Sequence, residues 1–307
     1  MRHLLATARG RVEVVEAEQP QLPPGHARVQ VAYVGVCHSD TARVREGQGA
    51  FPARLGHEVS GTVVETSADL QIPVGARVAA YVEDGYATEL VVPAGRIVPL
   101  HDDCSMLDGA LAEPLACVVG GIEMLELSHT PHVALVGAGF MGLMALRLLV
   151  ARGIPVTVVE PRERSRSLAL SWGAERAVSP EEAAEALPAG APVVVEATGS
   201  AGGLQLASDL TPIAGTLGVL GYHQSGGGKR TVDMEGWNFR ALKVLSLHHR
   251  NPADVMMWMD RAQRLAAAGI VSPSALVDLT VGLDGLPDVF AGSAPADSIK
   301  VALDATA

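Results

Sequence analysis

Side chains that bind metal ions occur in three short segments of the first part of the chain. GVCHSD places Cys37 and Asp40 at the end of an apolar strand, and LGHEVSG places His57 and Glu58 at the start of another. LAEPLAC contains Glu113. A lone cysteine, histidine or glutamate is usually a small buried residue, a satisfied polar residue or a solvated charge. Together, however, these residues supply one thiolate, one imidazole and one or two carboxylates, the mixed ligand set of a catalytic zinc with an open position.

A glycine motif follows an apolar segment in the middle of the chain. Gly137, Gly139 and Gly142 form G-x-G-x-x-G between the strand-like HVALV and the helix-like FMGLMALRLLVARG. The spacing alone is weak evidence in a chain with 33 glycines. In this context the helix N-terminus points free N–H groups at the turn, so a pyrophosphate fits there. Phe140 and Met141 lie inside the motif and are counted among the cofactor-binding residues.

The second strand of this region, PVTVVE, ends in Glu160. An acidic side chain at that place accepts hydrogen bonds from the adenosine ribose hydroxyls of a dinucleotide. Its charge would repel a ribose phosphate, which favours NAD over NADP. Arg162, Arg164 and Arg166 follow directly, and a phosphate could recruit one of them, so Arg162 is also counted as a cofactor-binding residue.

Two later apolar segments end in small or polar residues that are expected to line the binding crevice of the dinucleotide. EATGS contains Thr198 and Gly199, and LGYHQ contains Gly221 and Tyr222. In a doubly wound fold the carboxyl ends of the strands line the ligand crevice, so these residues are expected near the nicotinamide. The two histidines of SLHHR either face the substrate or simply end a strand.

The elements that must position these residues change character along the chain. The first quarter contains short apolar or alternating segments between Gly and Pro turns, which predicts a β-rich unit. From about Ala110, apolar strands alternate with helix-like segments, as in a parallel sheet covered by helices on both faces. The tail from about Ser272 returns to short strands and is expected to rejoin the first unit. The sequence therefore predicts an α/β chain with domains 1–122 plus 268–307 and 123–267.

Composition limits the class of ligand. The chain has 307 residues, 48% of them hydrophobic, and a net charge of −11 with scattered basic residues. This distribution gives no electrostatic footprint for nucleic acid or an anionic membrane, so a small-molecule ligand is expected. The opening segment lacks the apolar core of a signal peptide, which predicts a cytoplasmic protein. Three widely separated cysteines give no disulfide framework.

The motifs GVCHSD, GHEVSG, AEPLAC and VGAGFMG occur in an order and spacing that resembles the zinc-containing medium-chain alcohol dehydrogenases, especially the sorbitol and threonine dehydrogenase branch. The resemblance runs nearly end to end, to the closing KVAL. It implies a GroES-like catalytic domain, a Rossmann domain and a homodimer or homotetramer. It also implies hydride transfer between NAD(H) and a secondary alcohol or ketone of polyol, cyclitol or amino-alcohol type.

The same resemblance implies that Cys37, His57 and Glu113 bind one catalytic zinc, with Glu58 as a nearby or exchangeable ligand. Such a zinc is formally neutral and would lower the pKa of an alcohol in its open position. Because a second bound carboxylate would make the site anionic, Glu58 is assigned to an intermediate or outer position. Whether Glu58 or Glu113 is the resting carboxylate ligand stays open.

Three further roles are expected beside the zinc. Ser39 stands where the family has the hydroxyl that takes the substrate proton. Asp40 is expected to hydrogen-bond the ligand imidazole and fix its tautomer. By resemblance, His38 would face the cofactor phosphates. Many relatives carry a histidine at the position of Ala42 to end the proton relay, so the relay must end differently here.

The chain departs from many relatives at one place, and two other functions are alternatives to the expected dehydrogenase activity. VAAYVEDGYATEL runs straight through the place where many relatives have a lobe with four cysteines, so one zinc is expected rather than two. The first alternative is a zinc-independent NAD(P)H reductase of an activated C=C or C=N bond on the same fold. The second is a non-catalytic dinucleotide-binding redox sensor. Metal analysis with loss of activity on chelation would separate the first from a zinc enzyme.

Overall fold

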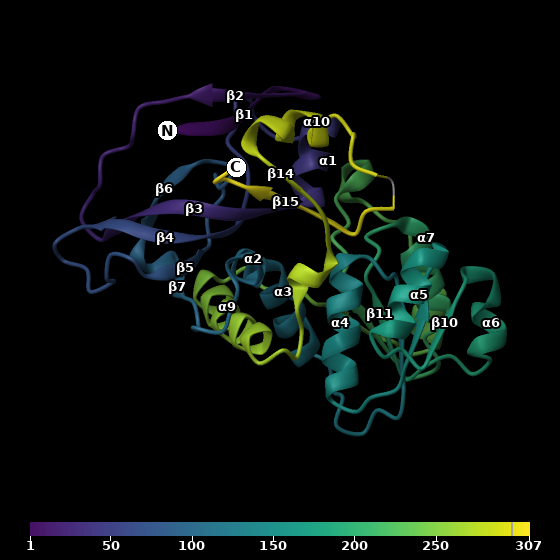
Figure 1. Ribbon diagram of the computed structural model, residues 1–307. Helices are drawn as coiled ribbons and strands as arrows, with labels where there is room; N and C mark the ends of the chain where they lie inside the picture. Colours follow the sequence, from purple (N-terminus) through teal and green to yellow (C-terminus); the bar gives the residue numbers. More distant parts are fainter. Residues whose placement is uncertain (296) are drawn as a thin grey trace. The chain divides into compact units, whose positions relative to one another are not determined.

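The computed structural model describes residues 1–295 and 297–307, and its contacts divide the chain into two units (Figure 1). Unit 1 comprises Met1–Ala116 and Arg250–Ala307, and unit 2 comprises Cys117–His249. These boundaries differ from the expected ones mainly because helix α9 (Pro252–Ala267) belongs to unit 1. There the buried side chain of Gln263 accepts the backbone N–H of His101 at 2.8 Å.

Unit 1 is built on a seven-stranded sheet in which segments far apart in sequence are neighbours. The strands run in the order β14-β15-β3-β4-β5-β7, and β6 also pairs with β3. The tail strand β15 is antiparallel to β3, with Val301 opposite Val36. The strands of unit 1 are β1 (Arg2–Ala8), β2 (Arg11–Glu16), β3 (His26–Val36), β4 (Glu58–Thr66), β5 (Arg77–Ala80), β6 (Glu89–Pro93), β7 (Ile97–Pro99), β14 (Val277–Val281) and β15 (Lys300–Asp304).

The helices of unit 1 include one that the sequence did not predict. Cys37 to Asp40 were expected at the end of a strand, whereas α1 (His38–Glu46) starts directly after β3. Cys37 is its N-cap residue, and the helix ends at Gly47 with φ of 72°. The others are α2 (Met106–Ala110), α9 and α10 (Leu286–Phe290), with 3-10 turns at Ala94–Arg96, Pro273–Leu276 and Leu283–Gly285. The boundary between the units falls within α3 (Ala112–Glu123).

Unit 2 is a six-stranded, fully parallel sheet. Its order β10-β9-β8-β11-β12-β13 reads 3-2-1-4-5-6 along the chain, the Rossmann order, with the topological switch between β8 and β11. This confirms the predicted doubly wound fold. The strands are β8 (Val133–Val136), β9 (Val156–Val159), β10 (Arg176–Val178), β11 (Val193–Glu196), β12 (Thr216–Val219) and β13 (Lys243–Ser246).

Helices cover the sheet of unit 2, whose central strands β8, β9 and β11 are buried throughout, as a two-sided parallel sheet requires. Helix α4 contacts β8 and β9, α5 contacts β9 and β10, and α7 contacts β8, β11 and β12. None of the helices in the described parts of the chain is long and apolar enough to cross a membrane. The helices are α4 (Phe140–Ala151), α5 (Glu163–Ser171), α6 (Ala183–Ala186), α7 (Ala201–Asp209) and α8 (Met234–Phe239), with 3-10 turns at Pro180–Glu182 and Ser225–Gly228.

Candidate functional site

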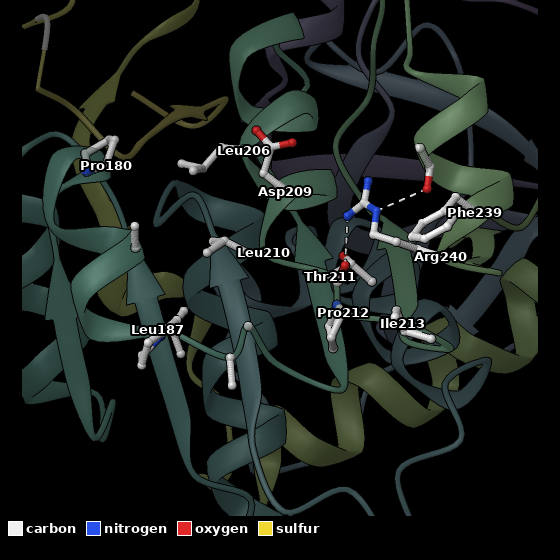
Figure 2. A pocket seen from close by; sticks show the side chains of 15 residues that line it. Pro180, Leu187, Leu206, Asp209, Leu210, Thr211, Pro212, Ile213, Phe239 and Arg240 are labelled. Atoms are coloured by element: carbon white, nitrogen blue, oxygen red, sulfur yellow. Dashed lines mark hydrogen bonds between the residues drawn. The ribbon is translucent and has the colours of Figure 1, made fainter.

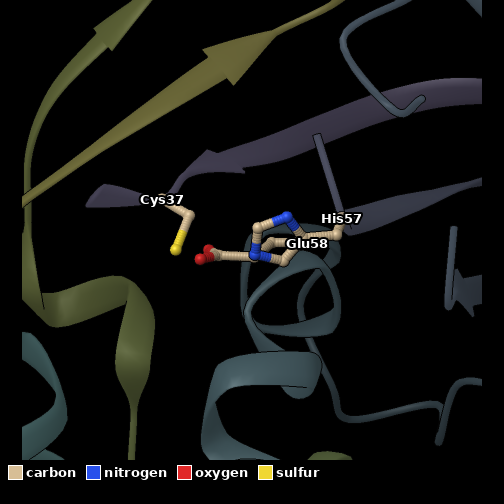
Figure 3. Close-up of side chains that lie close together, drawn as sticks. All are labelled: Cys37, His57 and Glu58. Carbon is tan, nitrogen blue, oxygen red and sulfur yellow. The ribbon is translucent and has the colours of Figure 1, made fainter. Parts of the chain in front are cut away.

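Three potential metal ligands converge in unit 1. Cys37, His57 and Glu58 each offer a ligand atom, and these atoms all lie within 4.8 Å of one another (Figure 3). Within residues 1–295 and 297–307 this is the one group of its kind. A sulfur, an imidazole nitrogen and a carboxylate oxygen form a donor set that suits zinc and leaves a position open. The residues present therefore fit a catalytic zinc.

Strand register explains how the ligands meet. In the antiparallel pair β3 and β4, Gly35 lies opposite Glu58, so Cys37 at the end of β3 faces the start of β4. A Cβ atom on Gly35 would lie 1.8 Å from Glu58 Oε2. The absent side chain at Gly35 thus provides the space in which the carboxylate of Glu58 lies.

Lys300 is a residue of this site that the sequence reasoning missed. Its Nζ donates to Glu58 Oε1 at 2.7 Å and lies 2.6 Å from Oε2. Both side chains are buried, at 6% and 1% exposure. The pairing of β15 with β3 brings Lys300 to the end of β3, beside Cys37. A lysine inside the apolar strand segment SIKVALD was a usable signal, because a buried lysine needs a carboxylate partner.

The ion pair between Lys300 and Glu58 changes the expected net charge of a zinc site that includes Glu58. From the sequence, Glu58 is assigned to an intermediate or outer position, because two bound carboxylates would make a zinc site anionic. Lys300 supplies the compensating positive charge, so Glu58 can lie in the ligand group without leaving net negative charge behind. Glu113 lies in the first turn of α3, is buried, and is not a member of the three-residue group in the described chain.

The field around His57 is negative. Burial by itself lowers the pKa of His57, but a hydrogen bond and charge from Cys37, together with the charges of Asp40 and Glu113, outweigh it. The pKa of His57 is raised to about 11 as a result. A pocket that holds a proton on imidazole so firmly is one that stabilises a cation, which is a second sign that the site suits a metal.

We expect zinc affinity to rise with pH. Since the pKa of the metal-free His57 is raised from 6.5 to about 11, its ring is protonated at neutral pH and a metal must displace that proton. Displacing one proton makes the association constant rise about tenfold per pH unit between pH 6 and 9. Competition titration against a zinc chelator at several pH values measures this slope. A flat profile would contradict the assignment of His57 as a ligand.

Two residues in the first turn of α1, Ser39 and Asp40, contact the ligand group. Ser39 Oγ donates to Cys37 Sγ at 3.1 Å. Asp40 is buried, and its Oδ2 lies 3.5 Å from His57 Nδ1. Because Nδ1 faces Asp40, Nε2 is the ring nitrogen left for a metal. His38, the first residue of α1, is exposed.

The glycine motif of unit 2 forms the turn between β8 and α4. Gly137 has φ of 103°, and a Cβ on Gly142 would lie 2.1 Å from the carbonyl oxygen of Gly137. Both glycines are therefore required by the turn itself. Gly139, the N-cap of α4, has open space where a Cβ would point, so a ligand can approach its backbone closely. Phe140 and Met141 follow as the first residues of α4.

Glu160 lies beside this turn at the end of β9. Its Oε2 accepts the backbone N–H of Ala138 at 2.8 Å, and its Oε1 accepts Nε of Arg162 at 2.7 Å. Burial raises the pKa of Glu160, but the hydrogen bonds from Arg162 and Ala138 outweigh it and the net pKa is lowered. Glu160 is thus an ionised carboxylate, with Arg162 directly at hand.

The turns after β11 and β12 adjoin the glycine motif. A Cβ on Gly137 would lie 2.8 Å from Thr198 Cγ2, and one on Gly221 would lie 2.3 Å from the backbone nitrogen of Gly199. The three turns are therefore packed together at the carboxyl edge of the sheet. Tyr222 is exposed and packs edge-on against His248, with the ring centroids 5.9 Å apart.

A buried polar chain behind these turns was not predicted. Glu196 accepts the backbone N–H groups of Thr198 and Gly199 and a hydrogen bond from His223 Nε2 at 2.9 Å. On the other side of that ring, Arg230 Nε donates to His223 Nδ1 at 2.9 Å. Arg230 closes the glycine-rich segment SGGGKR, and its contacts with His223 and with the Gly199 carbonyl attach that segment to the turn after β11.

Two protein families match the two parts of the chain. Residues 23–113 match the alcohol dehydrogenase GroES-like domain, and residues 141–264 match the zinc-binding dehydrogenase family. The first match contains Cys37, His57, Glu58 and Glu113, and the second contains Gly142 and Glu160. The predicted GroES-like and Rossmann domains are both confirmed by these matches.

Comparisons with individual proteins support the same family. A D-altritol 5-dehydrogenase of Agrobacterium fabrum is 33% identical over 63% of this chain and 68% of its own length. A galactitol 1-phosphate 5-dehydrogenase of Escherichia coli K12 is 27% identical over 59% of this chain and 62% of its own length. A crystal structure from Sinorhizobium meliloti 1021, described as a zinc-binding dehydrogenase bound to NADP, has a TM-score of 0.88 and 25% identity and covers 99% of this chain and 98% of that chain. The chain belongs to the zinc-binding, medium-chain alcohol dehydrogenase family of oxidoreductases.

Proposed function

We propose that this protein is a zinc-dependent dehydrogenase that transfers a hydride between NAD(H) and a secondary alcohol or ketone of polyol type. The observation that carries the proposal is the convergence of Cys37, His57 and Glu58 within 4.8 Å in a buried, negatively charged pocket. The polyol class is supported by the D-altritol and galactitol 1-phosphate dehydrogenases among the similar proteins.

Cys37, His57 and Glu58 would hold the zinc, with Glu113 near enough to add its charge. When bound, zinc supplies Lewis acidity that lowers the pKa of a substrate hydroxyl or polarises a carbonyl. Asp40 orients the imidazole of His57, and Lys300 neutralises Glu58. Ser39 Oγ, which donates to Cys37 Sγ, is the hydroxyl that exchanges a proton with the substrate. The buried Ala42 has no group to extend this transfer, so we assign the next step to solvent.

The cofactor site is formed by the turn Gly137–Gly142 and by Glu160, with Thr198, Gly221 and Tyr222 at the nicotinamide end. Gly139 leaves room for the pyrophosphate at the N-terminus of α4, where backbone N–H groups stabilise negative charge. The ionised Glu160 accepts ribose hydroxyls, which favours NAD. The similar Sinorhizobium meliloti structure binds NADP, and here Arg162, which donates to Glu160, is the candidate partner for a ribose phosphate.

Replacing Glu160 by alanine is expected to reduce the preference for NAD over NADP by about 10- to 100-fold, since a charged hydrogen bond contributes about 1.5–3 kcal/mol. The change removes the repulsion of a ribose phosphate and releases Arg162 to bind it. The ratio of kcat/KM for the two cofactors measures the effect. Glu163→Ala, which removes an exposed acid three residues later, is the control and should leave the ratio unchanged. An unchanged ratio in Glu160→Ala would contradict this role.

A polyol panel assayed with NAD and NADP, with zinc quantified in the same sample, tests the proposed activity. We expect one zinc per chain, oxidation of secondary alcohols, and loss of activity on chelation that added zinc restores. A zinc-independent reductase of C=C or C=N bonds would keep its activity after chelation. A redox sensor would bind the dinucleotide with no turnover of any substrate on the panel.

We also propose a homodimer formed through unit 2. Strand β13 ends the parallel sheet and pairs with β12 alone in the described chain, so its outer edge is open to another strand. Val244 in this strand is 39% exposed, and two further apolar side chains of unit 2 are exposed, Ile213 at 70% and Phe239 at 82%. Ile213 and Phe239 also line a hollow of about 700 Å³ in unit 2 (Figure 2). A second copy that pairs its own β13 would cover this edge with two-fold symmetry.

Light scattering tests the dimer and its surface. We expect a mass of twice 31.8 kDa for the wild type, or four times if two dimers associate. Val244→Asp should shift the protein to monomers, because it places charge on the paired edge. Val74→Asp, at an exposed valine of unit 1, is the matched control. A monomeric wild type would contradict the proposal.

We further propose that the protein works in the cytoplasm on a small molecule, without a nucleic-acid or membrane partner. Support comes from the three cysteines of the described chain, which form no disulfide and suit a reducing compartment, and from the scattered basic residues. Cell fractionation with an antibody to the protein tests this, and recovery with the membrane or nucleic-acid fraction would contradict it.

A further inference from the structure

Tyr86 is a fully buried phenol beneath the candidate metal site, and sequence reasoning gave it no role. Its hydroxyl donates to Asp40 Oδ2 at 2.8 Å. The same oxygen accepts the backbone N–H of Cys37 at 3.4 Å, and the carbonyl oxygen of Gly35 also lies 3.4 Å away. One hydroxyl therefore contacts both the end of β3, which carries Cys37, and the carboxylate that adjoins His57.

Asp40 connects this hydroxyl to the second ligand. The oxygen that accepts the Tyr86 hydrogen bond, Oδ2, is also the one that lies 3.5 Å from His57 Nδ1. The terminal torsion of an aspartate has a broad range, so a single weak contact to the imidazole would leave the carboxylate free to rotate. The shorter hydrogen bond from Tyr86 fixes it in the orientation that faces His57.

Tyr86 is itself held rigidly by its surroundings. Its backbone N–H donates to the carbonyl of Leu55 at 3.0 Å, and its carbonyl accepts the N–H of Leu4 at 2.8 Å. Its ring packs edge-on against Phe290, at 5.8 Å between centroids. A Cβ on Gly56 would lie 2.7 Å from the Tyr86 nitrogen, so the glycine before His57 lets the two segments approach.

We propose that Tyr86 is a positioning residue for the catalytic metal, which acts through Asp40 on His57 and through the backbone on Cys37. The inference rests on the proposed function, because it assumes that these two side chains bind zinc. It goes beyond that function by assigning a contribution to metal retention to a tyrosine that touches neither substrate nor metal. A hydrogen-bond partner one step further out than Asp40 should still affect how tightly the metal is held.

Tyr86→Phe tests the proposal, because it keeps the ring and its packing and removes only the hydroxyl. We expect zinc release to a chelator to be about tenfold faster than in the wild type, as when outer hydrogen bonds to metal ligands are lost. The visible spectrum of the cobalt-substituted protein should also shift, since it reports the geometry of the Cys37 and His57 bonds. We expect kcat to fall while the KM for the cofactor stays unchanged. Tyr33→Phe, which removes the hydroxyl of a half-buried tyrosine in β3, is the matched control.

A purely structural role for the hydroxyl gives a different result. In that case Tyr86→Phe would lower the melting temperature of the metal-free protein but leave zinc release and the cobalt spectrum as in the wild type, which would overturn the proposal. The double variant Tyr86→Phe with Asp40→Asn tests whether Tyr86 acts on the metal site through Asp40. If Tyr86 acts through Asp40, the two effects on zinc release combine to less than their sum, whereas full additivity would overturn that route. A wild-type protein that binds no zinc would instead refute the proposed function.

Discussion

Replacing Cys37 by alanine is expected to abolish zinc binding and to reduce dehydrogenase activity by at least about 1,000-fold. The group at Cys37, His57 and Glu58 has the smallest ligand number that a catalytic zinc tolerates, so the loss of its only sulfur leaves two ligands. The magnitude follows because the metal contributes several kcal/mol of transition-state stabilisation. Metal analysis after dialysis and kcat/KM for the best polyol are the measurements.

Cys104 provides a control for this substitution. It is a free, buried cysteine of unit 1, and burial raises the pKa of its thiol to about 11, so it stays a neutral thiol. Cys104→Ala should retain zinc and activity. If Cys37→Ala retained stoichiometric zinc, the assignment of the metal to this group would be wrong, whatever its activity.

Replacing Lys300 by methionine is expected to lower the free energy of unfolding of the metal-free protein by about 3–5 kcal/mol. The change removes one partner of a buried ion pair and leaves the carboxylate of Glu58, at 1% exposure, without its positive charge. A chemical denaturation curve of the metal-free variant and of the metal-free wild type measures the loss. Arg264→Met, which breaks an exposed pair with Asp260, is the control and should lower the free energy of unfolding by less than about 1 kcal/mol.

The double variant Glu58→Gln with Lys300→Met separates charge from packing. If Lys300→Met lowers the free energy of unfolding because it isolates the Glu58 carboxylate, a neutral glutamine at position 58 should recover most of the lost stability. Zinc should also recover part of it in the Lys300→Met single variant, because a cation again adjoins Glu58. Equal instability of the single and double variants would show that the ion pair is not the cause.

The sequence predicted the parts of this molecule that depend on local patterns. The strand, G-x-G-x-x-G and helix around Gly137, and the acid at Glu160, follow from residues that are close together in the chain, and the Rossmann order confirms the fold. The edge strand β10 has no comparable local signal, because it is only three residues long and begins with an exposed arginine. Helix α1 was missed because GVCHSD continues the apolar run of β3 without a strong helix signal.

The candidate site was predicted less completely because it depends on contacts between distant segments. The motifs pointed to Cys37 and His57, but nothing near Glu58 in the sequence indicated the charge that would compensate it. That charge comes from Lys300, and the register of β15 against β3 is a property of the folded sheet. Tyr86 likewise looks like an ordinary aromatic residue of a glycine-containing turn until its hydroxyl is seen on Asp40.

The pairing of Glu58 with Lys300 has a consequence for synthesis of the protein in the cell. The two residues are 242 positions apart, so a ribosome adding 5–20 residues per second makes Lys300 about 12–50 s after Glu58. During that interval the nascent chain already contains Cys37, His57 and Glu58 but lacks their built-in counter-charge. A chain that meets zinc early can use the metal in place of the missing ammonium group. We therefore expect that zinc supply during translation, as well as after it, affects the yield of folded protein.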